Sequence, residues 1–534
     1  MGKLKKQGFL QGAMILAIAN ILVKCIGLFF KIPIRRLFGA NGMGIYTSAY
    51  SLYNIMFVIA TAGLPVAISK MVSETSTKGN WKETKKVYKI ARIILLAIGV
   101  VGTAILFFGS NFIADNMKIS DSAMPIRALA PSLFFVAILS VNRGLCQGLS
   151  NMVPTAISET IEAMGKLVIG LGLAIVFLQT TGDVVSGVSG AILGVTTGTC
   201  IAAIYITIGS RNIKKHIYDK AKEDSSTDSA SVKSLALRLA KLAIPITIGA
   251  SVFTLASTID LFMITRQLEG LGYSEAARTT MYGYYAGDAV TMFNMPPTVI
   301  TALSVSIVPA IASAFVKHDI IGARKTTETA IRITLLFALP CAVGMSVLSA
   351  PILQLIMGDA GASTLLSILS YGIIFVCLVL VSNSVLQSMG QVWTPVIHMC
   401  IGGIVKVVVN YILVGNPQIN INGAPVGTVL CYLVTSMLNL ISISKYLKPK
   451  YGIDFILKSA LGAAIMGFAV YFIYSKMSLM GQGTLTMLVA LGVSIAVGVI
   501  LYFALLFITK AMKKQDIEFM PKSEKILKLV GRFL

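Results

Sequence analysis

A lysine stands inside the first long apolar stretch of the chain. Lys24 lies near the middle of residues 9–32, and Asn20 precedes it by one helical turn. A charge near the centre of a bilayer costs about 2.5–3.5 kcal/mol on insertion scales, so it persists where it has a partner or a wet cavity. We therefore expect Lys24 to line a hydrophilic cavity. The alternative is an ion pair with a carboxylate such as Glu159 or Glu162.

A basic cluster follows at the far end of the same stretch. The run KIPIRR contains Lys31, Arg35 and Arg36. Lysine and arginine donors that converge on a pyrophosphate form charge-assisted hydrogen bonds, which are strongest where water is partly excluded. The alternative is that these long side chains extend to lipid headgroups at the membrane surface. The spacing of Lys24 and this cluster predicts an anion site along the first stretch.

Two aspartates in later apolar stretches are candidates for binding a coupling cation. Asp260 ends the run STID, where neighbouring hydroxyl groups would help its carboxylate to bind Na⁺ or a proton. Pairing with Arg266 or Lys24 is the alternative for Asp260. Asp288 lies near the mouth of the following stretch, where a capping or solvated role would also explain it.

The segments that carry these residues recur along the chain. Similar sequence segments recur about 240 residues apart, which is the pattern of a transporter built from internal repeats. The run YSLYN, which ends at Asn54, corresponds to the run VTMFN, which ends at Asn294. Asp260 falls on the repeat position of Asn20. The equivalent asparagines Asn54 and Asn294 are therefore added to the candidate substrate-binding residues.

The composition predicts an all-α polytopic membrane protein. Of 534 residues, 56% are hydrophobic and 13% are charged, which leaves too little polar surface for a soluble domain. Apolar stretches long enough to cross a bilayer of about 30 Å recur about fourteen times. They lie near 9–32, 45–69, 87–109, 125–149, 154–178, 186–209, 236–265, 281–314, 328–350, 364–388, 394–414, 425–444, 455–475 and 482–509.

The distribution of charge predicts the orientation. The net charge of +23 is concentrated in alternate loops, as it is when loops stay cytoplasmic, and this argues against a nucleic-acid partner. Lys118 is the one lysine or arginine in the intervening loops near 110–120, 179–185, 351–363 and 415–423. Both termini are thus predicted inside. An even number of spans in each repeat makes the two halves parallel.

These observations predict two six-helix lobes followed by two extra helices. In the fifth span, Glu162 and Lys166 stand four residues apart and are expected to pair on one helix face. The seven cysteines and three histidines show no metal-ligand spacing, so no zinc, haem or other cofactor is expected. The predicted parts are an N-lobe at 1–210, a cytoplasmic linker at 211–235, a C-lobe at 236–447, helices 13 and 14 at 448–511, and a basic amphipathic tail at 512–534.

Several motifs together resemble a known family. The chain is similar to the polysaccharide-biosynthesis and SpoVB/MurJ-like flippases of the multidrug/oligosaccharidyl-lipid/polysaccharide exporter superfamily. The resemblance covers nearly the whole chain. It rests on ILAIAN at 15–20, LFGA at 37–40, GMGIY at 42–46, GLPVAISK at 63–70, SE at 73–74, LQ at 386–387 and GAPVG at 423–427.

The resemblance implies a function and roles for some residues. It implies two lobes around a central cavity and export of undecaprenyl-linked sugars by alternating access without ATP hydrolysis. Relatives of the MurJ type face the lipid pyrophosphate with arginines from spans one, two and eight. Lys24 matches the first-span cation and Arg36 the basic residue near the outer end. The second-span position falls near Phe57, and the eighth span has no internal arginine, which leaves lipid II itself open.

The resemblance also bears on coupling and on the partners. A seventh-span aspartate, here Asp260, is similar to the family's sodium-site acid. We expect a monomer in a bacterial cell membrane, with a polyprenyl-linked glycan lipid and membrane lipids as partners. The alternatives are a cation-coupled multidrug exporter of the same superfamily and a non-transporting scaffold. A membrane glycosyltransferase would need an acidic catalytic loop outside the spans, and none stands out.

Overall fold

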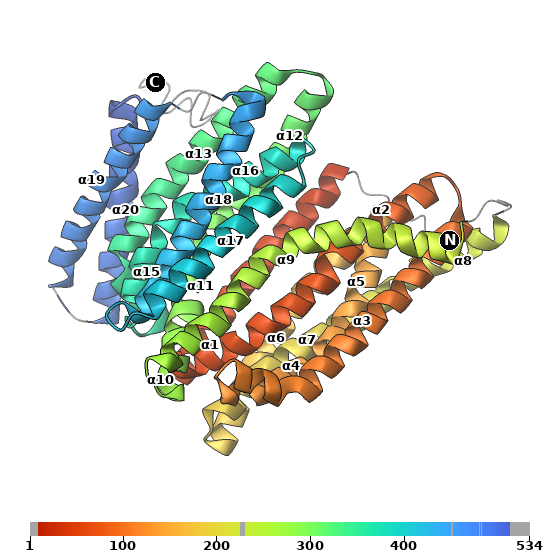
Figure 1. Ribbon diagram of the computed structural model, residues 1–534, viewed down its shortest axis with the longest axis horizontal. Coiled ribbons are helices and arrows are strands. Elements are labelled where there is room, and N and C mark those ends of the chain that lie inside the picture. Colours follow the sequence, from red (N-terminus) through yellow and green to blue (C-terminus); the bar gives the residue numbers. More distant parts are fainter. Residues whose placement is uncertain (1–8, 225–229, 450–451, 480, 482, 513–534) are drawn as a thin grey trace. The chain divides into compact units, whose positions relative to one another are not determined.

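The protein folds into helices alone within the part of the chain that the structure describes. The computed structural model describes residues 9–224, 230–449, 452–479, 481 and 483–512. It contains twenty α-helices, two π-helical segments and two 3₁₀ segments, and none of the described residues forms a strand (Figure 1). The predicted basic tail lies outside the described residues from position 513 onward.

The chain divides into two compact units, Met1–Gly283 and Tyr284–Leu534. This division does not bear on the predicted lobe boundaries, which stay a prediction. The first unit contains α1 (Phe9–Val58), η1 (Ile59–Gly63), α2 (Leu64–Thr77), α3 (Trp81–Asn116), η2 (Ser120–Ser122), α4 (Ala123–Leu129), α5 (Ser132–Gly148), α6 (Val153–Thr181), α7 (Val184–Gly209), α8 (Arg211–Glu223), α9 (Val232–Gly270) and α10 (Glu275–Tyr282).

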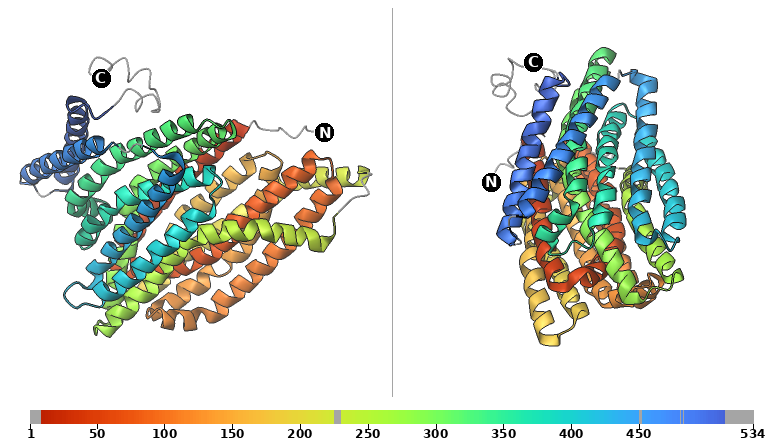
Figure 2. Two further views of the ribbon diagram at one scale, coloured as in Figure 1. Left: turned by 45° about the horizontal axis from the view of Figure 1, so that its top comes forward. Right: turned by 90° about the vertical axis from the view of Figure 1, so that its left-hand side faces the viewer.

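The second unit holds the remaining helices. Within it, α19 and α20, dark blue in Figures 1 and 2, pack side by side, and α19 also packs against α13. The elements are η3 (Gly283–Ala289, whose first residue ends the first unit), α11 (Val290–Phe293), α12 (Met295–Val316), α13 (Ile320–Val347), α14 (Ser349–Met357), α15 (Ser363–Ser370), α16 (Gly372–Ser388), α17 (Trp393–Val414), η4 (Asn420–Asn422), α18 (Gly423–Leu447), α19 (Ile453–Ser478) and α20 (Thr484–Ile508).

The membrane-spanning character of the chain is confirmed. Ten helices among the described residues are long and apolar enough to cross a bilayer, or up to twelve if two bent helix pairs each count as one span. Fourteen spans were predicted, and the number differs because the breaks between helices lie at other positions than the predicted ends of the apolar stretches. The segment Met14–Thr77 contains two predicted stretches, and the stretch 281–314 is divided among α10, η3, α11 and α12.

Helix starts follow local sequence signals. Proline occupies one of the first two positions of α2, α6 and α12, where a missing N–H costs no intrahelical bond. Other helices begin after a side chain that accepts a hydrogen bond from a free backbone N–H. These caps are Asn80 for α3, Asp183 for α7, Ser231 for α9, Ser274 for α10 and Asp319 for α13.

Two glycine features shape the first unit. Gly39 interrupts α1 with a φ of 66°, a conformation that glycine adopts without steric cost, so the segment is two helices joined at a kink. The helices α6 and α7 touch at glycines: a Cβ on Gly165 would lie 2.4 Å from the Cα of Gly198. Small residues allow such close backbone approach in membrane helices. The backbones of α6 and α7 are therefore in close contact beside Lys166, the neighbour of Gly165.

Candidate functional site

Four candidate residues form one stripe along the first part of α1. At about 100° per residue, Asn20, Lys24, Lys31 and Arg35 fall within about 60° of one another around the helix. We call this set the α1 stripe. Asn20 and Lys24 are exposed, Lys31 is half-buried and Arg35 is buried. Arg36 lies outside the stripe and is exposed.

The remaining candidates are spread over both units. Asn54 is half-buried on the second part of α1, and Asp260 is buried on α9. In the second unit, Asp288 is fully buried in η3, and Asn294 is exposed between α11 and α12. The first unit therefore holds the α1 stripe, Asn54 and Asp260.

Helix α9 meets α1 close to Asp260. The hydroxyl of Thr258 donates to the backbone carbonyl of Ser51 on α1 at 3.4 Å and to that of Thr254 at 3.1 Å. Asp260, two residues further along α9, is 4% exposed. Among the described residues, no three histidine, cysteine or acidic side chains cluster closely enough to hold a metal ion.

The structure changes the expected pairing of Glu162. Its carboxylate binds the guanidinium of Arg143 on α5, with 3.0 Å between Nη2 and Oε2, rather than Lys166 on its own helix. The Nε of Arg143 also donates to Ser158 Oγ at 2.9 Å. Within the described part of the chain, Lys24 forms no ion pair with Glu162 or Glu159 at a distance of 4.0 Å or less.

Arg143, which is buried inside an apolar helix, was not among the predicted site residues. Arg143 could have been identified from the sequence, because it is a charged residue near Cys146 in an otherwise apolar run. A charge inside a membrane needs a partner. Arg278 was missed as well, because it lies just before the predicted eighth stretch. It is buried in α10.

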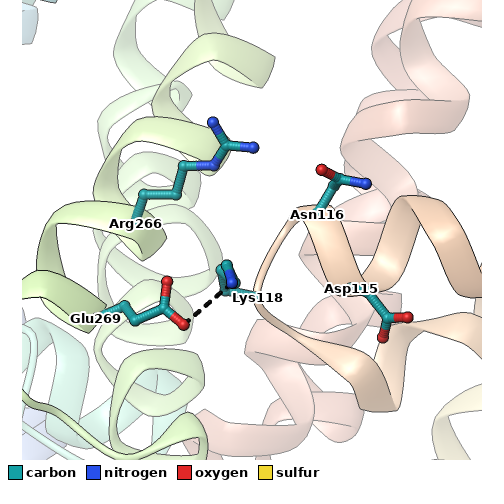
Figure 3. Close-up of a pocket in the computed structure, with 5 residues that line it drawn as sticks. All are labelled: Asp115, Asn116, Lys118, Arg266 and Glu269. Atoms are coloured by element: carbon teal, nitrogen blue, oxygen red, sulfur yellow. Dashed lines mark ion pairs between the residues drawn. The ribbon is translucent and has the colours of Figure 1, made fainter.

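An open pocket of about 570 Å³ lies between the ends of α3 and α9. Figure 3 shows the ion pair that crosses it, from Lys118 Nζ to Glu269 Oε1, at 3.2 Å. Arg266 lines the same pocket from α9, and Asp115 and Asn116 line it from α3.

The segment between α3 and α4, which contains Lys118 and Ser120, also contacts α10. The backbone N–H of Ser120 donates to the carboxylate of Glu275 at 2.5 Å. The guanidinium of Arg278 donates to the Lys118 carbonyl at 3.3 Å and to the Tyr273 carbonyl at 2.7 Å. Lys118, the basic residue of the predicted loop near 110–120, thus lies in a network that joins α3 to α9 and α10.

Part of the predicted linker is a helix. Residues Arg211–Glu223 form α8, which packs against α3 with Ile213 and Ile217 buried. The Lys214 ammonium lies 5.7 Å from the centre of the Tyr88 ring. Burial and the positive charge of Arg92 lower the pKa of Lys214 to about 8. The positive charges of Lys214 and Arg92 therefore disfavour each other at this end of the first unit.

Comparisons with known proteins agree with this architecture. The model of the family described as polysaccharide biosynthesis protein matches residues 9–316, and a MatE model matches residues 283–412. Stage V sporulation protein B of Bacillus subtilis (strain 168) is 24% identical over 535 residues, with 99% of both chains covered. Lipid II flippase MurJ of the same organism is 25% identical over 480 residues, which cover 86% of this chain and 87% of that one.

Solved structures share the fold. A structure described as lipid II flippase MurJ in an inward closed conformation matches with a TM-score of 0.68 at 16% identity, over 93% of this chain and 98% of that chain. An inward-facing MATE family transporter matches with a TM-score of 0.66 at 15% identity, over 81% and 99%. Since the family model covers more than half of the sequence, this multi-pass membrane protein belongs to the polysaccharide biosynthesis protein family and has the fold of MurJ and MATE transporters.

Proposed function

We propose that the protein is a flippase that moves an undecaprenyl-pyrophosphate-linked sugar from the inner to the outer leaflet by alternating access. The substrate is lipid II or another cell-envelope oligosaccharide precursor. The protein acts as a monomer in the bacterial cell membrane with both termini in the cytoplasm. Relatives named as a lipid II flippase and as a sporulation protein support this substrate class.

The α1 stripe is the observation that carries the proposal. A row of amide and cationic groups inside a helix of high mean hydropathy is expensive unless it meets a polar ligand or water. Lys24, Lys31 and Arg35 offer several N–H donors in line, which suits the oxygens of a pyrophosphate. Arg36, Asn54 and Asn294 would contact other parts of the substrate.

Coupling to a cation is the second element of the proposal. Asp260 is buried on α9 where this helix hydrogen-bonds α1, so neutralising its carboxylate would change the electrostatics of that contact. We assign the binding of Na⁺ or H⁺ to Asp260, with Asp288 as a second acid. The expected phenotype of Asp260→Asn is retained lipid binding with loss of dependence on an imposed ion gradient.

Transport in proteoliposomes tests the function. A fluorescent undecaprenyl-pyrophosphate-linked sugar is incorporated in the inner leaflet, and its arrival outside is followed by a membrane-impermeant quencher. Lys24→Ala should slow flipping by about tenfold or more, because a hydrogen bond to a charged group contributes about 1.5–3 kcal/mol. Lys476→Ala, which removes an exposed lysine of α19, is the matched control.

Two results would contradict the proposal. Flipping by the parent protein no faster than in empty liposomes would refute the function for this substrate class. Equal rates in Lys24→Ala and Lys476→Ala would remove Lys24 from the site. Export of a cationic drug in place of the lipid would support the multidrug exporter instead.

A further inference from the structure

Three helices of the second unit, α16, α17 and α18, share a hydrogen-bond network that the proposed site does not use. Asn439 of α18 is fully buried at the centre of this network. Its amide nitrogen donates to Ser382 Oγ at 2.9 Å and to Asn383 Oδ1 at 2.8 Å, both on α16. Its amide oxygen Oδ1 lies 2.8 Å from Nδ1 of His398 on α17. One amide side chain therefore joins the three helices.

The network determines which nitrogen of His398 carries the hydrogen when the ring is neutral. The hydroxyl of Ser382 donates to the carbonyl of Val379 at 3.2 Å, so Ser382 Oγ is left to accept from the amide nitrogen of Asn439. Both amide hydrogens of Asn439 are then used, and its oxygen is an acceptor. An acceptor that faces Nδ1 requires a hydrogen on Nδ1. The neutral ring therefore has its hydrogen on Nδ1 and a lone pair on Nε2.

The helices around His398 contain no carboxylate. His398 is half-buried in the second turn of α17, which packs against α16, α18 and η4. These four elements, all described in full, have no aspartate or glutamate. Their charged residues are Lys406, about 12 Å further along α17, and Lys445, about 9 Å beyond Asn439 on α18. The other titratable side chains of these elements are those of Cys377, Cys400, Tyr411, Cys431, Tyr432 and Tyr446.

The internal repeat shows what the first unit has at the equivalent place. A shift of about 240 residues superimposes the bounds of α5 on those of α16, and the first residue of α6 on that of α17. The same shift relates Arg143 to Asn383 and Ser158 to His398. In the first unit, Arg143 donates to Ser158 at 2.9 Å and forms an ion pair with Glu162. This helix contact is thus permanently charged in the first unit, whereas the second unit has a histidine, whose charge can change.

We propose that His398 is a proton-binding site of the second unit, separate from the cation site proposed at Asp260. The lone pair of Nε2 takes up H⁺, and no hydrogen bond of the network breaks, because the Nδ1–H group donates to Asn439 in both charge states. Histidine is the side chain whose charge ordinarily changes between about pH 5 and 8. Uptake of the proton adds one positive charge where α16, α17 and α18 meet.

Nitrogen NMR of the purified full-length protein tests the position of the hydrogen and the uptake of the proton. The chain has three histidines, so isotope labelling of the histidine rings gives few signals, and His398→Gln assigns one of them. If that variant does not fold, the double variant His216→Gln with His318→Gln leaves the signal of His398 alone. At about pH 8.5, we expect a protonated Nδ1 and an unprotonated Nε2. On acidification to about pH 5, Nε2 should gain a proton while Nδ1 keeps its own.

Two results of this measurement would overturn the site. One is a neutral ring with its hydrogen on Nε2, which would mean that the Asn439 amide is turned the other way. The other is an Nε2 that stays unprotonated at about pH 5.

A pair of variants tests whether the network fixes the hydrogen on Nδ1. Asn439→Leu removes the acceptor, so the neutral ring of His398 should show a loss of the Nδ1–H form in favour of the Nε2–H form. Asn383→Ala is the matched control, because it leaves the Asn439 oxygen and the bond to Ser382 in place, and the Nδ1–H form should persist. An unchanged Nδ1–H signal in Asn439→Leu would refute the role of the network.

The failure of this site and the failure of the proposed function are distinguishable, since the NMR measurement requires no transport. Proton uptake by Nε2 in a protein that does not flip the lipid-linked sugar would support the site and refute the function. Flipping by a protein whose Nε2 stays unprotonated would leave the function intact and refute the site.

Discussion

At the scale of single residues, the buried pair of Arg143 and Glu162 is the feature with the largest expected effect on stability. Their side chains are 10% and 19% exposed. Removing one partner of such a pair leaves a buried charge without compensation, at a cost of about 3–5 kcal/mol. Arg143→Met should therefore lower the thermal unfolding midpoint markedly in detergent.

A second variant checks the cause of that loss. Adding Glu162→Gln to Arg143→Met removes the stranded carboxylate, so the double variant should recover part of the lost stability. If the two losses simply add, the Arg143–Glu162 contact does not explain the effect.

The pairing of Arg143 also shows what the sequence can and cannot establish about single residues. The α1 stripe was predictable, because Lys24, Lys31 and Arg35 lie on one helix and helical periodicity alone places them on one face. The partner of Glu162 was not predictable from periodicity. Spacing favours Lys166 on the same helix, but the approach of α5 to α6 brings Arg143 nearer.

At the scale of elements, the start of α7 depends on one side chain. The Asp183 carboxylate accepts hydrogen bonds from the backbone N–H groups of Val185 and Ser186 at 3.2 and 2.9 Å. These bonds lower the pKa of Asp183, with the Ser186 N–H as the largest cause. Asp183→Ala should cost about 1 kcal/mol of stability, whereas Asp183→Asn should cost less.

The lowered pKa fixes the pH dependence of this cap. The folded state favours the charged carboxylate, so its contribution is present above the pKa that Asp183 has in the unfolded chain and is lost as the pH falls. The difference in thermal midpoint between the parent and Asp183→Ala should therefore shrink as the pH is lowered through the acid range. A difference that grows on acidification would contradict the role of the charged cap.

The contact between Lys118 and Glu269 joins α3 to α9 at the open pocket. Both side chains are about two-fifths exposed, so a double-mutant cycle should give a coupling of about 0.2–1 kcal/mol that weakens with added salt. The double variant Lys118→Glu with Glu269→Lys should recover the stability that either change removes alone. A coupling energy of zero at low salt would show that the pair contributes nothing.

The starts of several helices could be predicted from local sequence signals alone. Proline residues and side-chain caps mark the starts of α2, α3, α6 and α7, and these residues can be recognised in the sequence. The extra helix α8 was missed, since a short polar segment such as residues 211–223 forms a stable helix here by burying Ile213 and Ile217 against α3. That stabilisation comes from tertiary packing.

At the scale of the whole molecule, the membrane potential should assist transport. A pyrophosphate with about two negative charges gains roughly 4.6 kcal/mol per 100 mV when it crosses from a negative interior to the outside. A lysine that moved with the anion would cancel about half of this gain, whereas a stationary Lys24 leaves it intact. We therefore expect an inside-negative potential to accelerate outward flipping in oriented proteoliposomes.

The measurement is the flipping rate over a series of clamped potentials. A rate that does not change with potential would count against electrogenic transport and favour tight ion exchange. The composition was sufficient to predict an all-α membrane protein, and the resemblance of several motifs to the polysaccharide-biosynthesis flippases predicted the family. They could not locate the boundary between the compact units, which depends on contacts between distant segments and falls at Gly283 and Tyr284.

That boundary coincides with the start of η3, a π-helical segment. A π turn contains one residue more than an α turn, so the side chains after it are rotated by about 100° relative to a regular α-helix. Asp288 belongs to this segment, so the extra residue decides which face of the helix carries its carboxylate.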